Sequence, residues 1–116
     1  MLNLSLIHTY FEFIKSGRKT IEGRINTPKF ENLKPGDKII FTSHQTQETL
    51  SCIVTRINRY ADFESMLRYE GVENLLPDIT NIKTGVQVYE ALPGYKEKVT
   101  TFGAIAITIT CSKDQA

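Results

Sequence analysis

A strict alternation over residues 103–111 limits, more than any other feature, what this chain can fold into. Ile105, Ile107 and Ile109 take every second position, and Ala or Thr side chains fill the positions between them. Side chains of a β-strand point alternately to its two faces, so this segment presents a bulky apolar face to a core. Such a strand needs neighbouring strands. The sequence therefore predicts a protein built around a β-sheet and argues against a helical bundle.

Four other segments have the composition of strands. Residues 2–6 alternate Leu with Asn and Ser, and residues 20–25 alternate Ile or Gly with polar side chains. Another strand is expected to begin at Lys38, directly after the turn signal of residues 34–37. Residues 50–57 are apolar on both faces, which is typical of a central strand of a barrel.

Short helices are expected between these strands. Thr9 and the glutamate three residues later have the spacing of a capping box. This spacing predicts a helix over residues 9–16 with Thr9 as its N-cap and Gly17 as its left-handed stop. A further helix is expected from about residue 84 to residue 92, and residues 95–101 are expected to add one helical turn. Together these elements predict an α+β fold, a small barrel of five to six strands with short peripheral helices.

Composition favours one domain over residues 1–116. The chain is 41% hydrophobic and 23% charged, and its formal net charge is +1. No basic and apolar leader and no apolar run of roughly 20 residues is visible, so we expect a cytoplasmic protein without membrane contact. Cys52 and Cys111 lie among β-branched residues without CxxC spacing, and we expect them to be free thiols. His8 and His44 are too isolated in the sequence to indicate a zinc site, so no metal and no cofactor is expected.

The stretch SGRKTIEGR, residues 16–24, places four charges in and beside a predicted strand. Glu22 and Arg24 share the face opposite Ile21. One explanation is a surface ion pair; the other is a polar pocket in which Arg24 binds a phosphate or carbonyl and Glu22 accepts from an amide or amine. Lys19 has the wrong parity for that face. It joins such a pocket only if the strand starts at Thr20 or contains a bulge. Otherwise it is an exposed charge at the beginning of the strand.

Glu70 stands at the end of the apolar stripe of another predicted helix, which follows the N-cap Asp62 and stops at Gly71. Its carboxylate is therefore expected to point inward or into a cleft. A buried carboxylate needs a nearby cation, or it takes a raised pKa that suits general acid–base chemistry. The alternative is a solvated Glu70 at a frayed helix end. The buried stripe is expected to consist of Phe63, Met66 and Leu67.

Several segments, in this order, resemble the ASCH domain, the activating-signal-cointegrator homology family of the PUA-like superfamily. They are FEFIKSGRKTIEGR, LKPGDKIIF, the pair Glu70-Gly71 and LPGYKEKVTTFGAIAI. The resemblance covers nearly the whole chain and implies a small PUA-like β-barrel whose cleft is associated with RNA or nucleotides. One bacterial branch of the family is similar to 4-acetylcytidine amidohydrolases, whose site uses a lysine, a threonine nucleophile and a helical glutamate. Lys19 matches that lysine and Glu70 matches that glutamate, but Glu22 stands in the place of the threonine.

The leading hypothesis is an ASCH-domain protein that binds RNA or a nucleoside-like ligand in a charged cleft. A net charge of +1 favours a compact ligand pocket over a broad RNA-backbone interface. The alternatives are an amidohydrolase acting on an acylated nucleoside, a ribonuclease, and a regulatory partner protein without a nucleic-acid role. We expect a monomer or weak homodimer. The candidate catalytic residues are Lys19, Glu22 and Glu70, and the candidate ligand-binding residues are Thr20, Arg24, Tyr89, Tyr95 and Lys96; the four charged residues Lys19, Glu22, Arg24 and Glu70 are expected to converge on one cleft.

Overall fold

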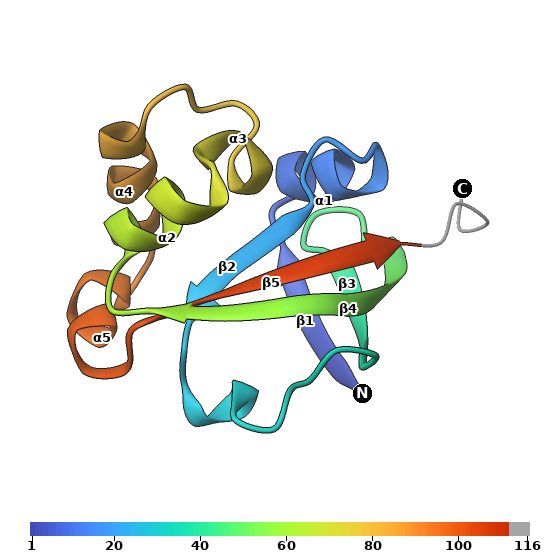
Figure 1. Ribbon diagram of the computed structural model, residues 1–116. Coiled ribbons are helices and arrows are strands. Elements are labelled where there is room, and N and C mark those ends of the chain that lie inside the picture. Colours follow the sequence, from blue (N-terminus) through green and yellow to red (C-terminus); the bar gives the residue numbers. More distant parts are fainter. Residues whose placement is uncertain (112–116) are drawn as a thin grey trace.

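The computed structural model describes residues 1–111, in which short helices lie along the upper and left sides of one curved sheet (Figure 1). Helices α2, α4 and α5 lie together on the left of Figure 1, and α1 stands apart from them on the right. The elements are β1 (Leu2–Leu6), α1 (His8–Lys15), β2 (Ile21–Ile25), a 3-10 turn (Pro28–Phe30), β3 (Lys38–Ser43), β4 (Thr49–Tyr60), α2 (Phe63–Glu70), α3 (Val72–Leu75), α4 (Ile82–Glu90), α5 (Tyr95–Phe102) and β5 (Ala104–Cys111).

The five strands pair in the order β1-β3-β4-β5-β2. β1 runs parallel to β3, and the other pairs are antiparallel. This order leaves β1 and β2 as the two edges of a half-barrel. The edges are linked by a hydrogen bond of 2.8 Å from Nη2 of Arg24 to the carbonyl oxygen of Ser5. The expected α+β barrel of five to six strands is confirmed as a half-barrel with five strands in residues 1–111, and the first helix lies between the first strand and the Ile21 strand as predicted.

β5 has a core on each of its faces. Ile105, Ile107 and Ile109 are buried as predicted, and they pack with side chains of β1, β3, β4 and α1. Ala104 and Ala106 face a second core, formed largely by the helices. The small alanine side chains leave room for helices to pack closely against the sheet, so the alternation of large and small residues fits two different neighbours.

The ends of α2 agree with the sequence, whereas the start of α1 does not. Asp62 accepts a hydrogen bond of 2.8 Å from the backbone N–H of Ser65, and Gly71 ends the helix at φ 91°. The predicted N-cap of α1, Thr9, is wrong because the helix already begins at His8 without a side-chain cap of its own. A distant side chain performs this task, since Oε1 of Gln45 accepts from the backbone N–H of His8 at 2.8 Å.

Cys52 and Cys111 form a disulfide, so the prediction of two free thiols is wrong. The two residues lie directly opposite each other in the β4–β5 ladder. Their apolar surroundings made core thiols the expected state, but the two cysteines are 59 residues apart in the sequence, and the register of β4 with β5 determines their pairing. Two smaller differences concern the helices: α4 begins at Ile82, and α5 is longer than the single turn expected.

Candidate functional site

The charged stretch ends in the edge strand β2, which begins at Ile21. Gly17 takes a left-handed conformation with φ 85° after α1, and it lets the chain turn back toward the sheet. Lys19 therefore precedes the strand and is free of the strand's alternation. Its side chain reaches the same region as that of Glu22, and both are buried, with exposed fractions of 3% and 4%.

The ammonium group of Lys19 is fully occupied by protein acceptors. Nζ donates to the carbonyl oxygens of Ile21 at 2.6 Å and Leu75 at 2.7 Å, and it lies 3.2 Å from Oε1 of Glu22. An ammonium has three N–H donors, and three acceptors are present. Burial is the main influence on the pKa of Lys19 and lowers it, although Glu22 opposes this effect. Lys19 thus ties β2 to α3 and holds the Glu22 carboxylate in place.

The Glu22 carboxylate is held between two cations. Its second oxygen, Oε2, accepts from Nε of Arg24 at 2.5 Å. Burial alone would raise the pKa of Glu22, but Lys19 and Arg24 outweigh that effect and keep the pKa below its ordinary value. Glu22 therefore remains a carboxylate at neutral pH. Each oxygen still has a lone pair with which it can accept a further hydrogen bond.

These three charged residues line a cavity of about 290 Å³ between the edge strands and the helices α4 and α5. Most of the remaining lining is apolar or aromatic, and it includes Tyr10, Tyr89 and Tyr95. The cavity combines a charged wall with aromatic surfaces. This arrangement can orient a flat, polar ligand through hydrogen bonds and enclose its apolar faces.

Two tyrosines of the cavity stack on one phenylalanine. The rings of Tyr89 and Tyr95 lie nearly parallel to that of Phe63, with centroid distances of 4.8 and 5.9 Å. Tyr89 fits because residue 23 is glycine: a Cβ atom at Gly23 would lie 2.6 Å from the Tyr89 hydroxyl oxygen. Burial, followed by the nearby Glu22 charge, raises the pKa of Tyr89 well above its ordinary value. The hydroxyl group thus stays protonated and can donate a hydrogen bond.

Tyr10 is a cavity residue that the sequence did not single out. Its hydroxyl group donates to Oδ1 of Asp78 at 3.1 Å, which links α1 to the segment after α3. Burial and Asp78 raise the pKa of Tyr10 to about 12. Tyr10, Phe13 and Ile14 stand at positions i, i+3 and i+4, a spacing that predicts only an apolar helical face. A sequence pattern does not reveal that this face borders a cavity.

The structure brings five of the eight candidate residues to this cavity and leaves three outside it. The side chain of Thr20 is exposed, and its backbone N–H donates to the carbonyl oxygen of Asn74. Lys96 is exposed on α5. The residues that line the cavity are Lys19, Glu22, Arg24, Tyr89 and Tyr95, and those outside it are Thr20, Glu70 and Lys96.

Glu70 belongs to a separate polar cluster with side chains of β4. It is buried as predicted, and the expected cation is Arg56, whose Nη2 donates to Oε1 at 2.6 Å. Asn58 Nδ2 donates to Oε2 at 2.9 Å, and the hydroxyl group of Tyr60 donates to the same oxygen. The expectation that Glu70 shares a cleft with Lys19, Glu22 and Arg24 is therefore not met. The Glu70 carboxylate accepts its hydrogen bonds from side chains of β4, whereas the cavity lies beside β1 and β2.

No helix within residues 1–111 is both long and apolar enough to cross a membrane. Among known protein families, the model of the ASCH domain family matches residues 4–111 of the chain. A comparison with curated protein sequences returned no match.

Solved structures resemble the chain over almost its full length. The crystal structure of the hypothetical protein PH0355 has 38% sequence identity and a TM-score of 0.86, covering 96% of this chain and 98% of that one. The solution structure of PF0455 from Pyrococcus furiosus has 36% identity and a TM-score of 0.75, covering 95% and 96%. The crystal structure of ASCH from Zymomonas mobilis shares the fold, with 17% identity and a TM-score of 0.64, over 93% of this chain and 65% of that one. The family match and the shared fold establish that the chain belongs to the ASCH domain family.

Proposed function

We propose that this ASCH domain binds a nucleoside, or a single base of an RNA strand, in the cavity between β1 and β2. The observation that carries the proposal is the Glu22 carboxylate, which Lys19 and Arg24 hold at the wall of an aromatic cavity. Such a fixed charge in a small pocket suits a ligand that offers hydrogen-bond donors. RNA or nucleotide binding is also what membership of the family leads us to expect.

The hydrogen-bonding groups of the wall are complementary to a nucleobase edge. Glu22 offers acceptors, and Arg24 uses one N–H for Glu22 and one for Ser5 out of the five donors of a guanidinium group. Adenine, cytosine and guanine present an amine donor beside carbonyl or ring-nitrogen acceptors, which pair with carboxylate and guanidinium groups respectively. Rings of all four bases can also stack on the ring of a tyrosine. Tyr10, Tyr89 and Tyr95 supply such rings at this cavity.

The size and charge of the site favour a compact ligand. A cavity of about 290 Å³ lies at the small end of the range of roughly 300–1,000 Å³ typical of small-molecule sites. A net charge of +1 is low for a protein that follows a long phosphate backbone. We therefore infer that one base or nucleoside occupies the cavity, and that any longer RNA makes few contacts outside it.

Binding has better support than amide hydrolysis or RNA cleavage. The three acceptors around Lys19 leave its ammonium group no donor for an oxyanion. Glu22 stands where the resembling hydrolases have their threonine nucleophile, and a carboxylate is a poor nucleophile for amide cleavage. Glu22 also pairs with both cations that a scissile phosphate would need. Glu70 lies in a different cluster.

Isothermal calorimetry with cytidine, N4-acetylcytidine, guanosine, uridine and a single-stranded RNA tetranucleotide tests the proposal. We expect at least one nucleoside to bind, and we expect Arg24→Met to weaken it about tenfold or more, as loss of a charged hydrogen bond does. Arg18→Met is the matched control, because Arg18 is exposed and lies over the Phe13 ring. Absence of binding, or equal losses in both variants, would contradict the proposal. Chromatography of the N4-acetylcytidine sample detects any cytidine that is formed. Its formation would show that the protein hydrolyses this ligand and does not only bind it.

A further inference from the structure

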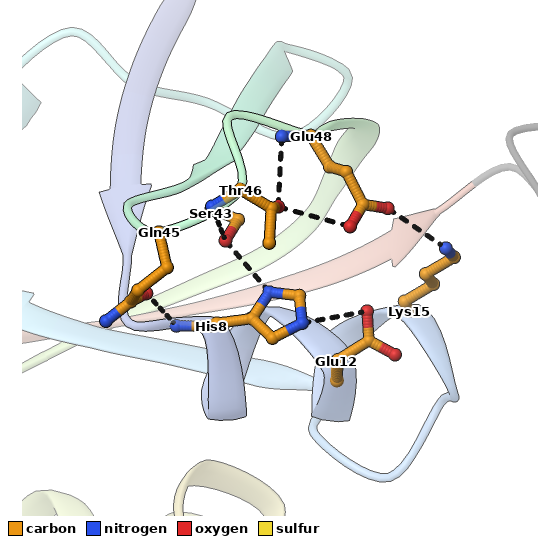
Figure 2. Close-up of polar contacts among 7 residues, drawn as sticks. All are labelled: His8, Glu12, Lys15, Ser43, Gln45, Thr46 and Glu48. Carbon is orange, nitrogen blue, oxygen red and sulfur yellow. Dashed lines mark hydrogen bonds and ion pairs between the residues drawn. The ribbon is translucent and has the colours of Figure 1, made fainter.

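A histidine and two glutamates, His8, Glu12 and Glu48, meet beside α1 (Figure 2). The sheet topology brings them together. β1 and β3 are parallel, and Leu6 at the end of β1 pairs with Ser43 at the end of β3. The segments that follow these two strands must therefore lie side by side: one is α1, which carries His8 and Glu12, and the other is the turn that leads to Glu48.

The three side chains have the spacing of metal ligands. Nε2 of His8 lies 3.8 Å from Oε2 of Glu12, and one ligand atom from each of His8, Glu12 and Glu48 lies within 4.8 Å of the other two. Two ligands of a tetrahedral zinc ion lie about 3.4 Å apart, given metal–ligand bonds of about 2.0–2.2 Å. Small rotations of the three side chains would bring their ligand atoms to this separation. The three side chains are 35–49% exposed, so an ion and a water ligand have access from solvent.

A buried hydroxyl group orients the imidazole ring from behind. Oγ of Ser43, which is fully buried, lies 2.9 Å from Nδ1 of His8 and accepts from the backbone N–H of Thr46 at 3.2 Å. Oγ1 of Thr46 donates to Oε1 of Glu48 at 3.1 Å. One turn thus positions both the histidine and a glutamate. Protein partners of this kind on the second ring nitrogen are typical of metal-binding histidines.

We propose that His8, Glu12 and Glu48 bind one Zn²⁺ ion through Nε2 and one oxygen of each carboxylate, with water as the fourth ligand. Zn²⁺ accepts a mixed nitrogen and oxygen set of this size, whereas Mg²⁺ and Ca²⁺ prefer six or more oxygen ligands. With zinc on Nε2, Nδ1 carries the proton and donates it to Ser43. This site cannot be predicted from the sequence, because Glu48 reaches the helix only through the pairing of β1 with β3.

Lys15 competes with the ion for one of its ligands. Its Nζ lies 3.4 Å from Oε2 of Glu48. A bound ion must displace this ammonium group or share the carboxylate with it. Removing the lysine charge should therefore strengthen zinc binding, whereas removing a ligand should weaken it. His8→Ala removes no negative charge, so a loss of binding in that variant distinguishes the site from non-specific attraction to surface charge.

Calorimetric titration of ZnCl₂ into the disulfide-bonded protein tests this site, since the bonded cysteines offer no thiolate. We expect one ion per chain. His8→Ala and Glu48→Gln should each weaken binding about tenfold or more, and Ser43→Ala should weaken it about tenfold through the ring orientation. Lys15→Met should strengthen it. His44→Ala is the control, because it removes an exposed imidazole of the same turn, and it should leave binding unchanged.

Three results would overturn the proposal. The first is the absence of saturable one-to-one binding by the unsubstituted protein, and the second is binding that Glu48→Gln leaves unchanged. The third is a loss with His44→Ala as large as that with His8→Ala, which would assign the ion to an ordinary exposed imidazole. The melting temperature with and without Zn²⁺ gives a second measurement, because an ion that binds only the native state raises it. Each variant's melting temperature without zinc shows that it is folded.

Discussion

Glu22 is the residue on which the candidate site most depends. It is buried and holds two cations, so removing its charge leaves Lys19 and Arg24 without their partner. Breaking a buried ion pair by removing one partner costs about 3–5 kcal/mol. We therefore expect Glu22→Gln to lower the free energy of unfolding by about that amount in urea titrations at neutral pH. Glu64→Gln breaks the exposed pair with Arg68 and should cost about 1 kcal/mol or less. Equal losses would contradict the buried pairing.

The same carboxylate makes stability depend on pH. The pKa of Glu22 lies below its ordinary value of 4.5, so the unfolded chain takes up this proton at a higher pH than the native protein does. The stabilisation is complete above about pH 5 and is lost as the pH falls through the folded pKa. We expect the difference in unfolding free energy between the unsubstituted protein and Glu22→Gln to shrink as the pH is lowered from about 6 to about 3. A difference that stays constant over this range would show that Glu22 does not titrate there.

Gly23 is required by its neighbours. A Cβ atom at this position would lie 2.6 Å from the Tyr89 hydroxyl oxygen and 2.8 Å from Cε of Met66. Overpacking of this kind costs about 1–3 kcal/mol, which we expect Gly23→Ala to show in chemical unfolding. The variant should also weaken ligand binding, because Tyr89 must move. Thr20→Ala, at an exposed position just before β2, should change stability by about 0.5 kcal/mol or less. An unchanged stability of Gly23→Ala would contradict the packing described.

At the scale of elements, the disulfide joins β4 to the end of β5. It closes a loop between residues 59 apart in sequence, and a cross-link of this kind stabilises a protein by about 2–4 kcal/mol. We expect dithiothreitol to lower the free energy of unfolding by that amount. The double variant Cys52→Ala/Cys111→Ala is the control and should not respond to reductant. Two free thiols in the unfolded, unreduced protein would contradict the disulfide.

The elements also show where sequence patterns suffice. Local signals placed α2 correctly, because Asp62 and Gly71 act on the backbone of their own helix. They failed for α1, whose first N–H group is satisfied by Gln45 from a distant turn. Alternation identified β5 and its buried isoleucines. It could not pair Cys52 with Cys111, because strand register depends on the whole sheet.

At the scale of the molecule, the family resemblance and the strand patterns predicted the barrel, but the site was predicted only in part. Lys19, Glu22 and Arg24 lie close together in the chain, so their association follows from local geometry once β2 begins after Lys19. The sequence predicts Glu70 in the same cleft, because its place in the helical stripe predicts burial and it matches a family position. Burial does not say which strand supplies the partners, and here that strand is β4.

Backbone amide NMR during titration with the nucleoside that binds most tightly tests the central claim most directly, because it locates the ligand. Our account predicts concentration-dependent shifts at Gly23, Arg24 and Tyr95, around the cavity. The amides of Arg56 and Tyr69, which lie at and beside the Glu70 cluster, should change little and serve as the internal control. Shifts centred on Arg56 and Tyr69, with the cavity amides unchanged, would contradict the account and move the binding site to β4 and α2.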